Sequence, residues 1–425
     1  MKRRQWLGWA GAGALMPGWL SGCTTPLSAS RAKVVVVGGG FGGATAAKYV
    51  RMWSDYGIEV TLVEPNPRFV SCPLSNLVIS QVSDMDDITL SYSTLVKRHG
   101  VTLVPERATA IDADKRIVRL AGGGELPYDR LILSPGVDFM WETLPGMATQ
   151  AARNKVLHAW KAGPQTLALR QQLKDMPNGG VYAIAVPLAP YRCSPAPYER
   201  ACLVADYFTR VKPRSKVLIL DANEDVLSKT AFFKGAWRTR YPDIVEYRPG
   251  QALSDVDAAS NTLKLEFGGE IKAQVLNVVP PMRAADIAYQ SGLATANQRW
   301  CEVDFLTFES KAIPHIHVLG DAIQIAPMMA KSGHMANQHG KVCAAAVVAL
   351  LSGQSPNSTP IYNNTCYSFI SKDEAIHVAS VHVYDPATLT MQPVHGAGGL
   401  SRLPNEVEAR AARAWGLSIW ADTLS

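Results

Sequence analysis

The chain has 425 residues, more than one hydrophobic core usually organises, so we expect two or three domains. Hydrophobic residues make up 47% and charged residues 18% of the sequence, and the mean hydropathy is near zero, which excludes a disordered chain and a protein with many membrane spans. The formal net charge of +6 is spread along the chain without a basic block, so we expect no nucleic-acid binding.

Residues 1–30 have the layout of an export signal. The pair Arg3 and Arg4 precedes an apolar run over residues 6–20, which is too short to span a membrane as a mature helix. The pair resembles a twin-arginine signal, which exports proteins that have already folded. Leu-Ser-Gly before Cys23 resembles the lipobox of bacterial lipoproteins, so Cys23 is either a lipid anchor or an incidental cysteine of an ordinary cleaved signal. We expect a periplasmic protein, tethered to the membrane if Cys23 is acylated.

A dinucleotide-binding pattern follows the export signal. Residues 34–37 are a continuous apolar run, which predicts a strand buried on both faces of a parallel sheet. The run leads into Gly38, Gly40 and Gly43, with the spacing Gly-x-Gly-x-x-Gly, and then into a helical stretch. These glycines permit a tight turn, a close approach to pyrophosphate and close helix packing. Glu64 ends a second predicted strand about 20 positions later, which suits a carboxylate on a ribose hydroxyl.

A second nucleotide-type pattern lies between about residues 151 and 270. Apolar strands are predicted at 181–186 and 217–220, on either side of a helical segment around 198–209. Residues 187–197, after the first of these strands, contain prolines and bulky side chains in place of a glycine fingerprint, and these block close approach of a pyrophosphate to the backbone. The pattern therefore predicts a domain that binds no pyridine nucleotide.

The chain then returns to its first domain. A strand is predicted at 313–319, followed by Gly320-Asp321-Ala322 and a helix from about 334 to 351. Beyond a stretch rich in Ser, Pro and Asn, the C-terminal block combines short strands, including 375–383, with a final helix over 406–420. We interpret this block as a third, smaller domain.

Two segments indicate that the dinucleotide is FAD. Residues 128–136, Tyr-Asp-Arg-Leu-Ile-Leu-Ser-Pro-Gly, resemble the crossover strand of flavoproteins with two dinucleotide domains, and residues 318–322 resemble their second FAD fingerprint, in which Asp321 contacts the ribityl chain. The resemblance implies an α/β fold with two Rossmann-like domains, as in glutathione reductase, and a small α+β C-terminal domain. The predicted domains are an FAD-binding domain over 31–150 and 271–355, a second nucleotide-type domain over 151–270, and a C-terminal domain over 356–425. The candidate cofactor-binding residues are Gly38, Gly40, Gly43, Glu64, Ala108, Ser134, Gly136, Gly320 and Asp321.

Five short segments carry a closer resemblance. They are residues 70–76 (Val-Ser-Cys-Pro-Leu-Ser-Asn), 191–202 (Tyr-Arg-Cys-Ser-Pro-Ala-Pro-Tyr-Glu-Arg-Ala-Cys), 299–304 (Arg-Trp-Cys-Glu-Val-Asp), 337–342 (Asn-Gln-His-Gly-Lys-Val) and 364–368 (Asn-Thr-Cys-Tyr-Ser). Together they resemble the flavoprotein subunit of flavocytochrome c sulfide dehydrogenase over about residues 30 to 425, with sulfide:quinone oxidoreductases as more distant kin. One departure is Ala196, where the family usually has glycine.

The resemblance implies roles for four residues. Cys72 matches the family cysteine that forms a thioether with the flavin, and its alternative is a plain buried thiol. Cys193 and Cys366 match a redox-active disulfide beside the isoalloxazine, which sulfide attacks; the alternative is a structural disulfide between two domains. Glu199 matches the acid/base that handles the protons of the sulfur groups, and its alternative is a charge stabilised by the dipole of the helix that it opens.

The remaining cysteines receive no catalytic role. Cys343 lies in an Ala/Val-rich helix and is predicted to be a small core residue. Cys202 and Cys301 are buried thiols by default, with a second disulfide as the alternative. Trp415 and Trp420 on the last helix are predicted to be core residues rather than flavin contacts. No metal site is predicted, because the nine histidines show no short Cys/His spacing.

The predicted function is oxidation of sulfide through the disulfide and FAD, with electrons passed to a c-type cytochrome subunit. The haem must lie on that partner, because the chain has no Cys-x-x-Cys-His motif. The alternative is a quinone-reducing enzyme, which needs an apolar C-terminal region to reach the bilayer, whereas residues 406–413 are charged and Ala-rich. A third alternative is an anchored subunit without turnover, which the retention of Cys72, Cys193 and Cys366 disfavours.

Overall fold

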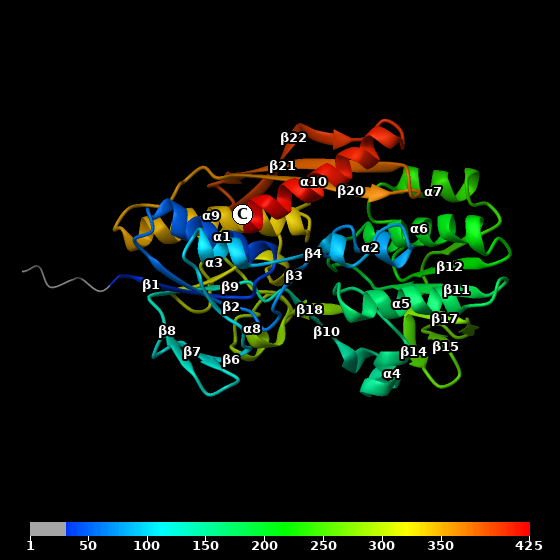
Figure 1. The fold of residues 1–425 in the computed structure, drawn as a ribbon, viewed down its shortest axis with the longest axis horizontal. Helices are drawn as coiled ribbons and strands as arrows, with labels where there is room; N and C mark the ends of the chain where they lie inside the picture. Colours follow the sequence, from blue (N-terminus) through cyan, green and yellow to red (C-terminus); the bar gives the residue numbers. More distant parts are fainter. Residues whose placement is uncertain (1–30) are drawn as a thin grey trace, which may run out of the picture. The chain divides into compact units, whose positions relative to one another are not determined.

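Two parallel β-sheets form the centre of the fold, and the computed structural model describes residues 31–425 of the chain (Figure 1). The predicted export signal over residues 1–30 and the lipid anchor at Cys23 lie outside the described residues.

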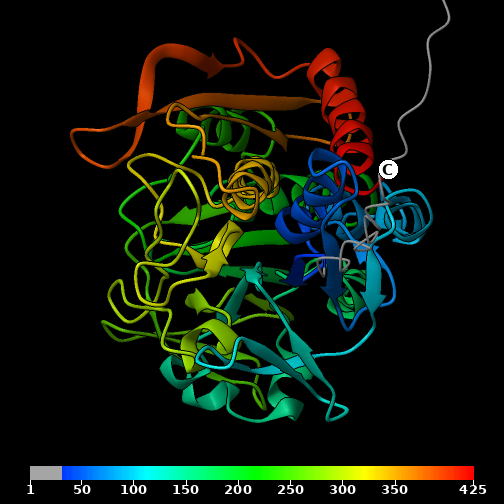
Figure 2. The same cartoon turned by 90° about the vertical axis from the view of Figure 1, so that its left-hand side faces the viewer.

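The first sheet has the strand order β19-β9-β1-β2-β5, and all of its strands are parallel. Its strands are β1 (Lys33–Val37), β2 (Glu59–Val63), β5 (Thr102–Val104), β9 (Arg130–Leu133) and β19 (Ile316–Val318). The apolar run at the start of β1 is buried because β1 lies at the centre, between β2 and β9. Helices α1 (Phe41–Trp53) and α9 (Gly333–Leu351) pack against each other beside this sheet, as Figures 1 and 2 show.

The second sheet has the order β13-β12-β11-β17 and is also parallel. Its strands are β11 (Val181–Val186), β12 (Lys216–Asp221), β13 (Val245–Arg248) and β17 (Val275–Val278), and the helices beside it are α5 (Pro164–Asp175), α6 (Ala196–Val211) and α7 (Thr230–Thr239). Strand β11 has the bounds that its apolar run predicted, and α6 extends two residues beyond its predicted segment at each end. Strand β19 is shorter than predicted, because the residues before Ile316 form a loop.

The C-terminal residues form an antiparallel sheet and one long helix. The sheet has the order β20-β21-β22, with β20 (Ile361–Phe369), β21 (Ala375–Asp385) and β22 (Thr390–Leu400), and α10 (Glu406–Leu424) packs against β21 and α1. The end of α10 is fixed to the first domain through Asp422. Its carboxylate accepts hydrogen bonds from Tyr49 at 2.6 Å and Asn337 at 2.7 Å, and it pairs with Lys341 at 2.8 Å.

The other elements are short. The strands are β3 (Phe69–Val70), β4 (Thr89–Leu90), β6 (Ala108–Asp112), β7 (Ile117–Leu120), β8 (Glu125–Pro127), β10 (Val137–Phe139), β14 (Leu253–Asp257), β15 (Thr262–Leu265), β16 (Glu270–Lys272) and β18 (Met282–Ala284). The helices are α2 (Ser75–Ile79), α3 (Ser93–Lys97), α4 (Gln150–Lys155) and α8 (Asp286–Gln290), with short 3₁₀ turns at Asp86–Ile88, Trp141–Thr143, Pro145–Met147 and Gly320–Ala322. Strands β6, β7 and β8 form one antiparallel sheet and β14, β15 and β16 another.

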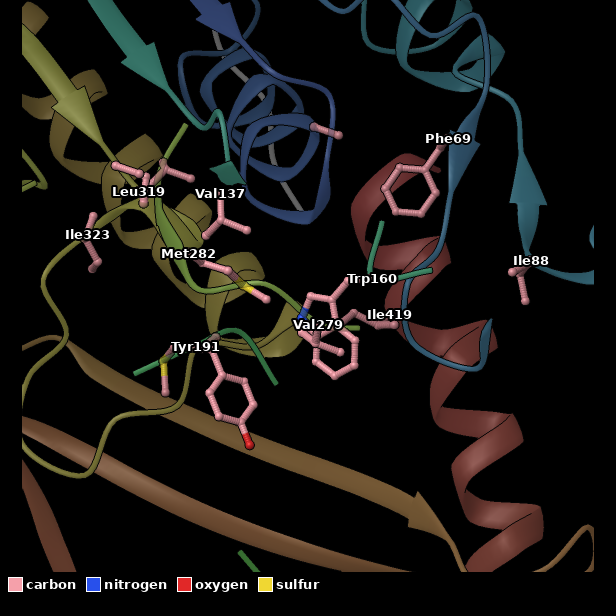
Figure 3. Close-up of a cluster of buried hydrophobic side chains, with 14 of the residues drawn as sticks. Phe69, Ile88, Val137, Trp160, Tyr191, Val279, Met282, Leu319, Ile323 and Ile419 are labelled. Atoms are coloured by element: carbon pink, nitrogen blue, oxygen red, sulfur yellow. The ribbon is translucent and has the colours of Figure 1, made fainter. Parts of the chain in front are cut away.

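The largest cluster of buried apolar side chains runs through both parallel sheets and reaches α10. Figure 3 shows one part of it, in which Val137, Met282 and Leu319 lie close together although they come from distant parts of the sequence. Strands β10 and β18 make this contact by pairing in antiparallel register, so they join the segments that leave and re-enter the first domain. Two parallel sheets with an antiparallel C-terminal sheet confirm the predicted α/β fold class.

Candidate active site

The glycine turn after β1 is closely packed on one side and open on the other. Gly38 has φ +98°, and a Cβ at this position would lie 2.3 Å from the carbonyl oxygen of Ser134. A Cβ at Gly43 would lie 1.9 Å from the carbonyl oxygen of Gly38, so the first turn of α1 can approach the strand only without a side chain. A Cβ at Gly40 would meet no atom within 4 Å. The open side is where a pyrophosphate would meet the N-terminus of α1.

Glu64 lies against this turn at the end of β2. Its Oε2 accepts a hydrogen bond from the backbone N–H of Gly39 at 2.7 Å, and its Oε1 accepts one from the N–H of Asn66 at 2.8 Å. The carboxylate is therefore buried and held by the backbone beside the turn. Oε1 also accepts a hydrogen bond from the side-chain amide of Asn66 at 2.6 Å, whereas Oε2 keeps a further lone pair that can accept a ribose hydroxyl.

The same edge of the first sheet carries four more of the predicted cofactor-binding residues, Ser134, Gly136, Gly320 and Asp321. The Ser134 N–H donates to the carbonyl of Val37 at 2.8 Å, which places the end of β9 beside the glycine turn. A Cβ at Gly320 would lie 3.6 Å from the hydroxyl of Ser134, whereas one at Gly136 would meet nothing within 4 Å. Asp321 is half-buried, and its Oδ1 is shielded from solvent and has no hydrogen-bond partner among the described residues.

These features fit FAD. A buried carboxylate oxygen without a partner is costly unless a ligand hydroxyl reaches it, and burial raises the pKa of Asp321. The glycine turn, Glu64 and Asp321 would hold the pyrophosphate, a ribose and the ribityl chain in that order. Ala108 differs from these candidates, because it opens β6 in a separate antiparallel sheet, opposite Leu120. Its cofactor role stays a prediction.

A cavity lies next to this edge of the sheet, and the three cysteines with predicted roles lie in its wall. Cys72, Cys193 and Cys366 all line it. Other lining residues come from the start of α9, from α6 and from α10; they include Ser332, His334, Glu199, Arg200 and Trp415. The cavity adjoins the glycine turn, because a Cβ at Gly333 of α9 would lie 3.0 Å from the ring of Phe41 at the start of α1. An isoalloxazine that continues from the turn would enter this cavity.

The thiols of Cys193 and Cys366 are hydrogen-bonded to each other in the cavity. Cys193 lies in the proline-containing loop after β11 with φ +59°, and its N–H donates to the carbonyl of Lys331 at 2.9 Å. Cys366 lies in β20 of the C-terminal sheet. Both cysteines are free thiols in this structure. The loop that replaces a second glycine fingerprint therefore carries one sulfur to the other across 173 residues of sequence separation.

The electrostatic surroundings of the two thiols differ, because Lys229 lies beside Cys366. The hydrogen bond between the thiols lowers the pKa of Cys366, which accepts it, and raises the pKa of Cys193, which donates it. The ammonium group of Lys229 lies 3.7 Å from the Cys366 sulfur and lowers the pKa of the Cys366 thiol further. When the pair holds a single proton, the negative charge therefore lies on Cys366.

Glu199 lies in the first turn of α6, between the cavity and the C-terminal sheet. Its Oε1 accepts a hydrogen bond from the N–H of Phe369 at 2.9 Å, and its Oε2 accepts one from the amide of Asn76 at 2.8 Å. Burial raises the pKa of the carboxyl to about 7, although these hydrogen bonds favour the charged form. Near neutral pH the group can therefore both accept and release a proton.

Cys72 follows β3 and is far from Cys193 and Cys366 in the sequence, yet it lines the same cavity. The backbone N–H of Ala162 donates to its sulfur at 3.5 Å. Cys202, Cys301 and Cys343 are buried elsewhere, where burial raises the pKa of each thiol. The nearest polar partner of Cys202 is the indole N–H of Trp237, at 3.3 Å, rather than another cysteine.

Sequence reasoning missed several residues of the cavity. Arg200 is buried and donates hydrogen bonds to Asn76, Asn277 and the carbonyl of His158. These bonds hold Asn76, which is itself hydrogen-bonded to Glu199. Lys229 was also missed, because nothing in its neighbourhood marks it apart from a surface lysine before a helix. Trp415 lines the cavity and is half-buried, whereas Trp420 is a core residue as predicted.

The described residues offer neither a cluster of metal ligands nor a membrane-spanning helix. Within residues 31–425, no group of three or more His, Cys, Asp or Glu side chains is placed to hold a metal ion. No helix in the same part of the chain is both long and apolar enough to cross a membrane.

Three family models match the chain. Residues 32–186 match the pyridine nucleotide-disulphide oxidoreductases. Residues 166–280 match the central part of the sulfide dehydrogenase (flavocytochrome c) flavoprotein chain, and residues 358–424 match the flavin-binding part of flavocytochrome c sulphide dehydrogenase. The first two matches overlap at residues 166–186 and together cover 32–280, and the third covers the C-terminal sheet and α10.

Two curated relatives illustrate the likeness. The sulfide dehydrogenase (flavocytochrome c) flavoprotein chain of Chlorobaculum thiosulfatiphilum is 65% identical over 46 residues, which is 11% of this chain and 94% of that sequence. The mitochondrial sulfide:quinone oxidoreductase of Dictyostelium discoideum is 25% identical over 305 residues, 68% of this chain. The match spans 65% of the length of the Dictyostelium protein.

The fold has a solved counterpart in the sulfide:quinone oxidoreductase of Aquifex aeolicus. The two structures superpose with a TM-score of 0.73 at 15% sequence identity, over 92% of this chain and 91% of the other. At this coverage the superposition includes both parallel sheets and the C-terminal sheet. The family matches and the Chlorobaculum relative lead to one assignment: the chain belongs to the flavoprotein chains of flavocytochrome c sulfide dehydrogenase, a family of flavin-dependent oxidoreductases.

Proposed function

We propose that this protein is an FAD-dependent sulfide dehydrogenase that uses a Cys193–Cys366 disulfide and passes electrons to a c-type cytochrome subunit. The observation that carries the proposal is the contact between these two sulfur atoms in a cavity that Cys72 also lines. Membership of a family named for flavocytochrome c supports the cytochrome partner.

The cavity carries positive charge that suits a small anion. Arg192 and Arg200 both line it, and the positive charge of Arg192 acts on Cys193. Such a cavity attracts HS⁻ in preference to neutral molecules of the same size. Arg192 also lies 3.9 Å from the carboxylate of Asp321, so the two charges partly balance when the cavity is empty of substrate.

In the oxidised protein, sulfide would open the disulfide and leave one cysteine as a thiolate. Bound FAD supplies the two-electron acceptor for the sulfur centre. Glu199 accepts a proton from the incoming sulfur or returns one to the leaving sulfur, because its pKa of about 7 allows both states near neutral pH. The hydrogen bonds from Phe369 and Asn76 hold this carboxyl at the cavity wall.

The proposal is tested by following the flavin absorbance of the purified protein. Sulfide is expected to bleach the flavin, and a soluble c-type cytochrome is expected to restore the colour faster than a short-chain quinone does. A protein that sulfide does not bleach would refute sulfide oxidation.

A quinone acceptor is the second candidate. The likeness to sulfide:quinone oxidoreductases in sequence and in fold favours it. Recovery of the bleached flavin with quinone alone would establish this alternative and exclude a cytochrome as the acceptor.

The proposal extends to flavin attachment and location. A thioether between Cys72 and the flavin would prevent cofactor loss after export, and flavin fluorescence that stays with acid-precipitated protein would detect it. The twin-arginine sequence and Cys23 support a periplasmic, lipid-anchored protein. Incorporation of labelled fatty acid into wild-type protein, absent from a Cys23→Ser variant, would establish the anchor.

A further inference from the structure

Lys229 is buried beside the thiol pair, and its ammonium group has three neighbours. It donates to the carbonyl of Cys366 at 2.7 Å, to the hydroxyl of Ser368 at 2.8 Å and to the Cys366 sulfur at 3.7 Å. Only 5% of the residue is exposed. It caps the start of α7 with φ +58°, a conformation that non-glycine residues rarely adopt. The backbone thus points a buried charge at one sulfur of the pair.

We infer that Lys229 stabilises Cys366 as the thiolate that leaves when the disulfide opens, so that sulfide adds to Cys193. The inference rests on the proposed sulfide chemistry and gives that reaction a direction. Lys229 touches a reacting atom, and the direction follows because a better-stabilised thiolate leaves faster.

The surroundings of the two sulfurs are unequal. Cys366 has Lys229 within contact distance and accepts the hydrogen bond from Cys193, and both effects lower its pKa. The hydrogen bond with Cys366, burial and the charge of Glu199 all raise the pKa of Cys193, and the positive charge of Arg192 opposes them. Arg192 also interacts with the sulfur of Cys72 and with the carboxylate of Asp321, so its positive charge stabilises a Cys193 thiolate less.

The opening step balances as a simple exchange. HS⁻ forms a new S–S bond to Cys193, the Cys193–Cys366 bond breaks, and its electron pair leaves on Cys366. The products are a protonated persulfide on Cys193 and a thiolate on Cys366, so the charge of −1 and the single proton are conserved. The disulfide itself is the two-electron oxidant of this step, so no further oxidant is needed. Lys229 changes no bond and supplies only the charge that the thiolate needs.

The first test compares wild-type protein with Lys229→Met. The matched control is Lys212→Met, since Lys212 is also buried and donates to the carbonyl of Lys174 at 2.7 Å, but it is bonded to no cysteine. For Lys229→Met we expect flavin bleaching by sulfide to slow by about 10- to 100-fold, the factor that corresponds to about 1.5–3 kcal/mol for a hydrogen bond to a charged group. The pH midpoint for alkylation of the reduced thiol should rise in the same variant. Lys212→Met should keep both wild-type values.

Unchanged bleaching and an unchanged alkylation midpoint in Lys229→Met would overturn the inference. A merely structural lysine would lower stability and leave the midpoint where it is. Failure of sulfide to bleach the wild-type protein would instead overturn the proposed function.

The second test needs no variant. Reduced wild-type protein is treated with less than one equivalent of an alkylating reagent near neutral pH, and the labelled peptide is identified by mass spectrometry. We expect the label on Cys366 before Cys193, because the thiolate reacts faster than the thiol. Label on Cys193 first would contradict the inference, whatever the folding of the Lys229 variant.

Discussion

Replacing Glu199 with glutamine should change how stability depends on pH. Burial raises the pKa of the carboxyl in the folded protein from 4.5 to about 7. The stability that this group contributes is therefore fully present below about pH 4.5 and is lost as pH rises through about 7. Since each pKa unit is worth about 1.4 kcal/mol, ionisation of Glu199 costs about 3 kcal/mol of unfolding free energy at high pH. Glutamine keeps the size of the side chain and avoids this cost.

The assay is chemical denaturation of wild-type protein and Glu199→Gln in parallel at several pH values. The unfolding free energy of the variant minus that of wild type should rise by about 3 kcal/mol between about pH 4 and about pH 9. Glu224→Gln is the matched control, because Glu224 is exposed at the surface, and its difference should stay flat. A flat difference for Glu199→Gln would show that the carboxyl is not held in an unfavourable buried site, and its role as a neutral-pH proton carrier would be refuted.

Three further predictions concern the cofactor site and the C-terminal contact. Gly43→Ala should yield protein with little bound flavin by absorbance, because the added Cβ would lie 1.9 Å from the carbonyl oxygen of Gly38; full flavin content would contradict the packing of the turn. Asp422→Ala should lower the unfolding free energy by about 1–3 kcal/mol in denaturation, because Lys341 and its other partners lose a charged acceptor, and an unchanged midpoint would disprove this. Cys72→Ser should release all flavin on acid precipitation; retention would place the linkage elsewhere.

The sequence predicted the α/β class because both sheets have strands that are buried on two faces. Apolar runs such as 34–37 and 181–186 have no other stable place in a water-soluble domain. The bounds of β19 were less predictable. Ile313 is apolar enough to continue a strand, but Pro314 lacks an N–H and His315 has φ +64°, so the residues before Ile316 form a loop. Pairing with β9 begins at Ile316.

The candidate site was predictable where a residue type has a local reason. Glycines 38 and 43 are required by backbone approach, and Glu64 by its place at the end of β2. The contact between Cys193 and Cys366 came only from family resemblance, because no local pattern joins two residues so far apart. Lys229 could not be predicted, because its burial depends on β20 arriving beside α7 from the C-terminal sheet.

The strand order of the first sheet also constrains the timing of folding during synthesis. Strand β19 completes the edge next to β9, yet it leaves the ribosome after the whole second sheet has been made. The second sheet draws all four of its strands from one uninterrupted stretch, 181–278, and can close as soon as that stretch emerges. The first sheet must wait for Val318, and the contacts of α1 and α9 with Asp422 form only when translation is almost finished. A nascent chain arrested after β17 has left the ribosome tunnel and before β19 has left it should therefore protect the second sheet from protease while the first is still cleaved.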